Sequence, residues 1–215
     1  LFSQDHWETA IFASDEWKYI VPDAEPQSNW NEISFDDETW VSSQGGFGYG
    51  DGDDGTVIEP AISVYFRKNF NVLDKSKLSS AILSADYDDG YIAYLNGFEI
   101  SRSYNLPEPG TFVSFDETTY YDHEASLYNE GIPDNIFLDS LLLNSLLVDG
   151  ENVLAVQVHN VGISSSDMSG NFFLTFGITD ESEFYSPPPF WFQEPIVFNQ
   201  FNLPIIMIDT YGAEI

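Results

Sequence analysis

Hydrophobic and polar residues alternate with a period of two along much of this chain, which is the pattern of half-buried β-strands. In residues 63–72, Val64, Phe66, Phe70 and Val72 fall on one face, and the opposite face is mostly polar. Similar alternation occupies residues 81–87, 91–95, 98–102, 152–160 and 172–178. The chain is therefore predicted to consist mainly of short strands.

The connections between these runs favour an antiparallel arrangement. Asn96-Gly97 separates two of the runs and is a strong signal for a tight β-hairpin. One stretch differs, because residues 139–147 begin with a helix-capping aspartate and space their leucines as a helix does. We therefore expect an all-β fold, an antiparallel β-sandwich with at most one or two short helices.

Two regions lack this alternation. Residues 103–135 contain prolines, glycines and acids with few clear periods, and both a functional loop and a poorly ordered insertion remain open. Residues 186–195 are rich in proline, as a stiff linker would be. We place a sandwich domain in residues 1–183. Residues 184–215 form a linker and a terminal strand, which either docks back on the sandwich or begins a following domain.

Charge and cysteine content narrow the functions that the chain can have. Its 215 residues include 36 acids and 6 bases, for a formal net charge of −30. The negative electrostatic potential of such a chain repels nucleic acid and anionic membranes. Neutral molecules and cations remain as possible ligands. There are no cysteines, which excludes disulfides, thiol catalysis and cysteine metal sites. Apolar runs are too short to cross a bilayer.

The stretch Gly45–Gly55 packs six glycines, three aspartates and two aromatics into eleven residues. Glycines allow sharp turns, and carboxylates supply the hard oxygen ligands that calcium prefers. A calcium loop using Asp51, Asp53 and Asp54 is one interpretation, and a plain acidic turn is the other. The calcium-binding helix-loop-helix pattern is excluded because Ile62 stands where that pattern needs an acid.

Two charged positions are candidates for ligand contact. Asp88 and Asp89 precede the predicted hairpin and could bind a cation or accept sugar hydroxyls; we expect one of the two to form a turn and keep the other as a site candidate. Arg102 could bind hydroxyls or a carboxylate with its planar fork. The competing interpretation is an internal salt bridge, for example to the aspartate of the Ser164–Asp167 loop.

Aromatic residues near polar loops are the third kind of candidate, because an aromatic face can stack on the apolar face of a sugar ring. Trp30, Trp40, Tyr49 and Tyr104 lie in such places. Taken singly, an aromatic residue in such a place is more often packed inside the sandwich.

Several motifs occur in a familiar order. They are Trp30, Phe35-Asp-Asp-x-x-Trp40, the glycine-rich stretch, Val64-Tyr-Phe-Arg-Lys68, Asp88-Asp-Gly-Tyr-Ile-Ala-Tyr-Leu-Asn-Gly97, Gly150-Glu-Asn-Val-Leu-Ala-Val-Gln-Val-His159 and Ser165-Ser-Asp-Met168. Over about residues 15–180 the chain resembles the galactose-binding-like jelly-roll domains of secreted multidomain bacterial proteins, which often accompany CotH-type or metallophosphoesterase domains. Residues 202–210 resemble the opening strand of a CotH-type domain. The resemblance implies a jelly-roll sandwich, commonly with structural calcium, and carbohydrate binding as a tendency of the class.

These observations lead to a working hypothesis of a secreted, monomeric, calcium-stabilised carbohydrate-binding module without catalytic activity. The predicted ligand-binding residues for neutral glycans are Tyr49, Asp89, Arg102, Trp30 and Tyr104. The alternative is a spacer or docking domain that supports a neighbouring catalytic domain, has no sugar affinity and holds its 184–215 tail against the sandwich. A glycosidase is disfavoured, because among 36 acids a pair of carboxylates arises by chance.

Overall fold

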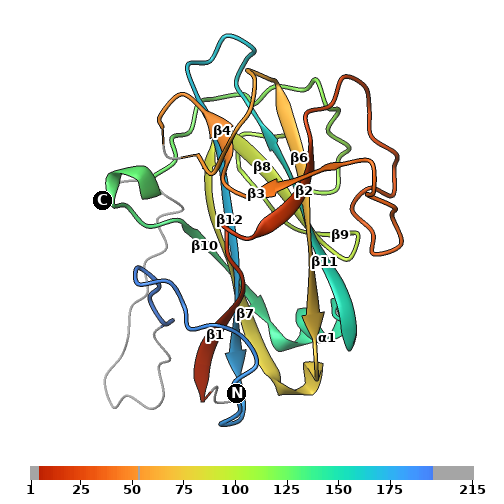
Figure 1. Cartoon of the computed structure of the whole chain (residues 1–215), viewed down its shortest axis with the longest axis vertical. Helices are drawn as coiled ribbons and strands as arrows, with labels where there is room; N and C mark the ends of the chain where they lie inside the picture. Colours follow the sequence, from red (N-terminus) through yellow and green to blue (C-terminus); the bar gives the residue numbers. More distant parts are fainter. Residues whose placement is uncertain (1–4, 53, 196–215) are drawn as a thin grey trace.

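Two β-sheets stacked face to face form a sandwich in the computed structural model (Figure 1). The structure describes residues 5–52 and 54–195. Sheet A has the order β10 (Asp134–Asp139), β7 (Leu78–Asp88), β12 (Met168–Ile178), β4 (Phe47–Tyr49) and β5 (Thr56–Val57), and β1 (His6–Ile11) also pairs with β12. Sheet B has the order β3 (Val41–Gln44), β2 (Glu16–Ile20), β6 (Ser63–Val72), β11 (Gly150–His159), β8 (Gly90–Leu95) and β9 (Phe98–Arg102).

The strand pairs are antiparallel except for the short parallel pair of β4 and β5. This confirms the predicted all-β sandwich. The hairpin between β8 and β9 turns at Asn96 and Gly97, which adopt φ angles of 53° and 90°. The one α-helix among the described residues, α1 (Ser140–Leu146), follows β10, and the Asp139 side chain accepts from the Leu142 backbone N–H as its cap. Short 3-10 turns occur at Lys75–Lys77 and Leu127–Asn129.

The main core lies between the sheets, where the predicted inward faces meet. Val64, Phe66 and Phe70 of β6 pack there together with Phe172 and Phe176 of β12. Burial of these apolar side chains is the main stabilising term of the sandwich.

The outer face of sheet B is also covered, which differs from the predicted half-buried strand 63–72. Tyr65 packs there with Trp30 and Trp40 in a second cluster, because residues 29–40 fold back over β6 and β11. Arg67 is buried in the same layer and pairs with Asp37 at 2.9 Å. Both faces of β6 are therefore buried over residues 63–67, whereas Asn69 and Asn71 of the same strand are exposed.

The connection from β9 to β10, residues 103–133, is called the long segment below. It crosses the outer face of sheet B, where Leu106 and Val113 cover Ile92 of β8. It then passes the end of β7 and enters sheet A as β10. Its green trace runs near the top of the molecule in Figure 1.

Residues 184–192, called the strap, lie against sheet A. Ser186 forms an isolated bridge with Thr9 of β1, and Glu8 accepts from the backbone N–H groups of Phe184 and Tyr185 at 2.9 and 2.8 Å. The proline-rich stretch predicted as a linker thus contacts the sandwich directly. The strand predicted at residues 203–209 lies outside the described residues. Among the residues that are described, no helix is long and apolar enough to span a membrane.

Candidate functional site

Three carboxylates from distant parts of the chain meet at one end of the sandwich. Asp88 ends β7, Glu124 lies in the long segment, and Asp167 precedes β12. Each offers an oxygen within 4.8 Å of the other two. Asp88 is buried, Asp167 is half-buried and Glu124 is exposed, so the group has a closed side and an open side. These three residues are called the acid cluster below.

Asp89 ties together the segments that carry the acid cluster. One of its carboxylate oxygens accepts from the His123 backbone N–H at 2.9 Å, and the other accepts from the Val161 N–H at 2.6 Å. These bonds fix the chain next to Glu124 and the loop that leads to Asp167. Sequence analysis placed Asp89 in contact with ligand, whereas the structure buries it with both oxygens engaged.

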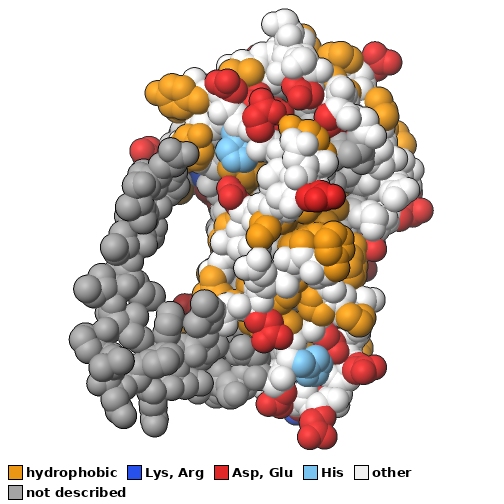
Figure 2. All heavy atoms as spheres, turned by 90° about the vertical axis from the view of Figure 1, so that its left-hand side faces the viewer, with side chains coloured by type: hydrophobic (Ala, Val, Ile, Leu, Met, Phe, Trp, Pro, Cys, Tyr) orange, Lys and Arg blue, Asp and Glu red, His pale blue; other side chains and the backbone are white. Residues whose placement is uncertain are grey.

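The acid cluster is electrostatically unfavourable when all of its members are ionised. Burial, together with the charges of Asp89, Asp167 and Glu124, raises the pKa of Asp88 to about 8. Figure 2 shows acidic side chains spread over one face of the molecule with few Lys or Arg among them. A proton or a bound cation would relieve the repulsion.

The six basic residues of the chain are engaged elsewhere. Four of them form ion pairs, namely Arg67 with Asp37, Lys68 with Asp15, Lys77 with Asp180 and Arg102 with Glu99. Lys18 donates to the Trp40 carbonyl, and Lys75 donates to the carbonyls of Asn144 and Leu147. The acid cluster therefore has no protein cation as its partner. Its three carboxylates are a donor set that suits a hard divalent ion such as calcium or magnesium.

The glycine-rich loop, where sequence analysis placed the metal, adjoins this site. Asp51 accepts from the Ser169 hydroxyl at 3.1 Å, and Ser169 stands opposite Asp88 in the β12–β7 register. The second oxygen of Asp51 is buried without a hydrogen-bond partner. Asp54 packs closely against Gly48: a Cβ atom added to Gly48 would lie 2.2 Å from a carboxylate oxygen of Asp54. Asp53 lies outside the described residues. Within the described ranges, the acids that converge are those of the acid cluster.

The aromatic candidates lie in different environments. Trp30 is only 6% exposed, and its ring is surrounded by those of Trp40, Tyr65 and Tyr94. Tyr49 is 7% exposed, and its hydroxyl accepts from the Asn160 side chain at 2.9 Å. Trp40 is also buried, in the same cluster as Trp30.

Tyr104, by contrast, is 72% exposed on the long segment. The predicted ligand-binding residues therefore do not come together on one surface. Tyr104 is the aromatic candidate whose ring is open to a ligand.

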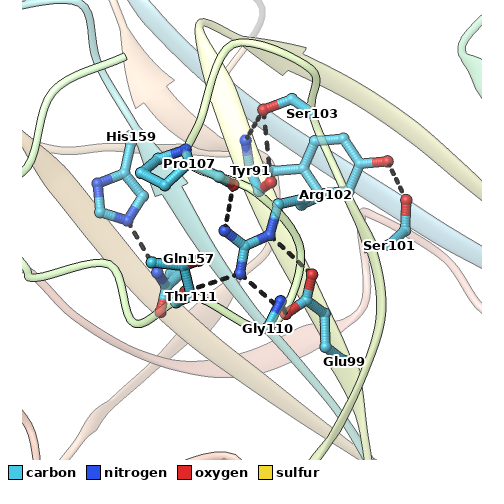
Figure 3. Close-up of polar contacts among 10 residues, drawn as sticks. All are labelled: Tyr91, Glu99, Ser101, Arg102, Ser103, Pro107, Gly110, Thr111, Gln157 and His159. Carbon is cyan, nitrogen blue, oxygen red and sulfur yellow. Dashed lines mark hydrogen bonds and ion pairs between the residues drawn. The ribbon is translucent and has the colours of Figure 1, made fainter. Parts of the chain in front are cut away.

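Arg102 is an internal anchor rather than an exposed fork. Its guanidinium makes a bidentate pair with Glu99 at 2.7 and 2.8 Å and donates to the carbonyls of Pro107 and Thr111 (Figure 3). Glu99 also accepts from the Gly110 N–H at 3.1 Å. Sequence analysis weighed an internal salt bridge for this residue. The structure supplies one with Glu99, which holds the start of the long segment to β9.

Further along, buried polar side chains pin the long segment to sheet B. The His159 ring shares a hydrogen bond of 2.8 Å with the Glu117 carbonyl, and the Ser63 hydroxyl donates to the Phe115 carbonyl at 2.6 Å. Burial lowers the pKa of His159 to about 4. The segment that sequence analysis left open between functional loop and poorly ordered insertion is thus held by specific contacts.

Comparisons with known proteins give fold-level likeness only. No protein-family model and no curated protein matches the chain. Among solved structures, a calcium-binding mutant of Bacteroides uniformis β-glucuronidase 2 aligns at 18% identity and a TM-score of 0.49, over 80% of this chain and 18% of that chain. A β-glucuronidase of an uncultured Clostridium sp. aligns at 15% identity and a TM-score of 0.49, over 82% of this chain and 30% of that one. A glycosyl hydrolase family 2 member from Bacteroides cellulosilyticus aligns at 15% identity and a TM-score of 0.48, over 77% of this chain and 20% of that one.

The chain thus spans less than a third of the length of these structures. At such identities and TM-scores the likeness supports no conclusion about activity or ligand.

Proposed function

We propose that this chain is a non-catalytic carbohydrate-binding module of a secreted bacterial protein, stabilised by calcium and favouring neutral glycans. One observation carries the proposal. At one end of the sandwich, the acid cluster adjoins a rigidly held segment whose tyrosine rings are exposed. The cluster would hold the cation, and the rings would meet the sugar. Neighbouring domains of a longer chain would supply any catalysis.

Calcium fits the acid cluster for two reasons. It takes six to eight oxygen ligands in flexible geometry, so three carboxylates leave positions for water or backbone oxygens on the open side. Its charge would also offset the repulsion that raises the pKa of Asp88. Because Asp88, Glu124 and Asp167 come from three segments, the ion would cross-link the end of the sandwich.

A neutral sugar suits the surface around the cluster. A net charge of −30 disfavours anionic glycans. Tyrosine offers an apolar ring face for the C–H groups of a pyranose and a hydroxyl for its polar edge. The convergence of the three acids on one point suits metal coordination rather than the separated pair that glycosidic bond cleavage requires.

Thermal unfolding with calcium and with a chelator tests the metal site. Calcium should raise the Tm of the wild-type chain, and the effect should grow with its concentration because the ion binds the folded state. Asp88→Asn should abolish this response. Without metal, the variant should be at least as stable as wild type because the amide avoids the free-energy cost of placing a carboxyl group, ionised or forced to stay protonated, in this buried acidic site. Exposed Glu59→Gln is the matched control and should respond to calcium as wild type does.

A panel of neutral and acidic glycans, screened in the presence of calcium, tests recognition. Binding to neutral members that the chelator weakens would support the module. Uniform silence would contradict it and favour the alternative, a spacer or docking domain. A specific observation supports that alternative, because the strap lies against sheet A instead of extending away from the sandwich.

A further inference from the structure

The long segment carries five exposed aromatic side chains, namely Tyr104, Phe112, Tyr120, Tyr121 and Tyr128. The exposed fractions of Tyr120 and Tyr121 are 56% and 64%. Single exposed rings are ordinary on protein surfaces. Here five of them lie on one segment whose backbone is held by the buried side chains of Asn105 and His159.

Asn105 joins the two parts of the segment that carry three of these tyrosines. It is fully buried, and its side-chain amide donates to the carbonyls of Asp89 at 3.2 Å and Tyr121 at 2.6 Å. Its own carbonyl accepts from the Tyr120 N–H at 2.8 Å. Tyr104 precedes Asn105 in the chain, so the backbones of Tyr104, Tyr120 and Tyr121 lie side by side.

Further bonds hold the second of these stretches in place. The Thr119 N–H donates to the Asn160 carbonyl at 3.2 Å, and the Thr119 hydroxyl donates to the Tyr121 carbonyl at 2.9 Å. Two residues beyond Tyr121, the His123 N–H is held by Asp89. Rings on a fixed backbone lose little conformational freedom when a ligand binds, and this lowers the entropic cost of recognition.

We infer that Tyr104, Tyr120 and Tyr121 form the face that contacts the sugar, and that buried Asn105 positions this face. This inference rests on the proposed function and names the residues that carry it. The ligand class is a neutral glycan whose rings stack on the phenol faces and whose hydroxyl groups hydrogen-bond to the phenol oxygens. The acid cluster then acts beside this face, because Glu124 follows Tyr121 by three residues.

Glycan affinity of the whole chain, measured with calcium for the best neutral ligand of the panel, tests the inference. Tyr104→Ala, Tyr120→Ala and Tyr121→Ala should each weaken binding by about tenfold, as central aromatic contacts do. Phe137→Ala is the matched control, because its ring is 58% exposed on β10 and lies outside the long segment. It should leave affinity unchanged.

Tyr→Phe variants at the same positions keep the ring and remove the hydroxyl, so they should lose less affinity than the alanine variants. If an alanine variant fails to fold, the corresponding Tyr→Phe variant, with a Tm near that of wild type, still allows the affinity to be tested on a folded chain. The outcomes separate the two proposals. If the wild-type chain binds glycans and the tyrosine variants bind equally well, the inference is overturned while the proposed function stands.

If the wild-type chain binds no glycan, the proposed function fails and this face loses its assigned ligand. Capture of a protein partner through the same tyrosines would also overturn the inference. Loss of glycan affinity in the tyrosine variants, with Phe137→Ala unaffected, is the result that supports it.

Discussion

The strap and the long segment both cross the surface of the sandwich, and both are rich in aromatic residues, yet most rings of the strap are partly buried whereas most rings of the long segment are exposed. In the strap, Trp191 packs on Phe173 with ring centroids 4.9 Å apart, and Phe192 packs on Trp7 at 5.6 Å. In the long segment, Tyr120 and Tyr121 point most of their surface to solvent. Aromatic content alone therefore does not separate a stabilising segment from a recognition segment.

The two segments are alike in how their backbones are held. A buried carboxylate, Glu8, accepts two strap N–H groups, and buried Asn105 and His159 bind backbone groups of the long segment. Buried polar groups of this kind are strongly destabilising when left without partners. Both segments also bury apolar side chains, Leu106 and Val113 in the long segment and Trp191 and Phe192 in the strap. The difference is that the long segment in addition leaves the rings of Tyr104, Tyr120 and Tyr121 exposed.

Removal of the strap's anchor should have the largest effect on stability. Glu8→Ala leaves the N–H groups of Phe184 and Tyr185 without their acceptor, and we expect the free energy of unfolding to fall by about 2–4 kcal/mol. Urea denaturation measures this change. Glu8→Gln keeps an acceptor oxygen and should lose less.

Exposed Glu183→Ala, one residue before the strap, is the control and should change stability by less than about 0.5 kcal/mol. Equal stability of Glu8→Ala and wild type would mean that the strap contributes nothing to the fold. The contrast between the two segments would then disappear.

Neighbouring aromatics within the strap provide a sharper comparison. Trp191→Ala removes a half-buried ring from Phe173, and we expect a loss of about 1–2 kcal/mol. Phe190 is fully exposed, so Phe190→Ala should stay within about 0.5 kcal/mol of wild type. The same urea titration compares both. Similar losses for the two variants would contradict the packing described for the strap.

Much of the fold could be predicted from local pattern. The period-two alternation of residues 63–72 and the Asn96-Gly97 turn reflect interactions between near neighbours, and both reappear as β6 and the β8–β9 hairpin. The cap at Asp139 is equally local. What pattern could not reveal was the second layer on sheet B, because burial of Tyr65 depends on residues 29–40 folding back from more than twenty positions away.

The candidate site was harder to predict for the same reason. Asp88, Glu124 and Asp167 are brought together by strand pairing and by the bonds of Asp89, and no spacing in the sequence links them. The aspartates clustered in the glycine-rich stretch gave a stronger local signal for a metal site, and the metal was therefore predicted there. Asp88 was recognised only as one of two possible site residues, and Asp167 only as a possible partner of Arg102.

Among these substitutions, replacement of His159, which anchors the long segment, should have the smallest effect on the free energy of unfolding. The pH dependence of that free energy makes the effect measurable. Burial lowers the pKa of His159 from about 6.5 in the unfolded chain to about 4 in the folded chain, so the unfolded state binds more protons between these two pH values. Stability contributed by this residue is therefore lost as the pH falls, by about 0.7 kcal/mol between pH 7 and pH 6.

Burial of Asp88 acts in the opposite direction, since its raised pKa makes ionisation costly as the pH rises. The difference between wild type and His159→Gln, measured by urea unfolding at constant calcium, cancels that second contribution. This difference should shrink as the pH is lowered from 7 to 6, and a pH-independent difference would show that His159 does not hold the long segment as a neutral, buried ring.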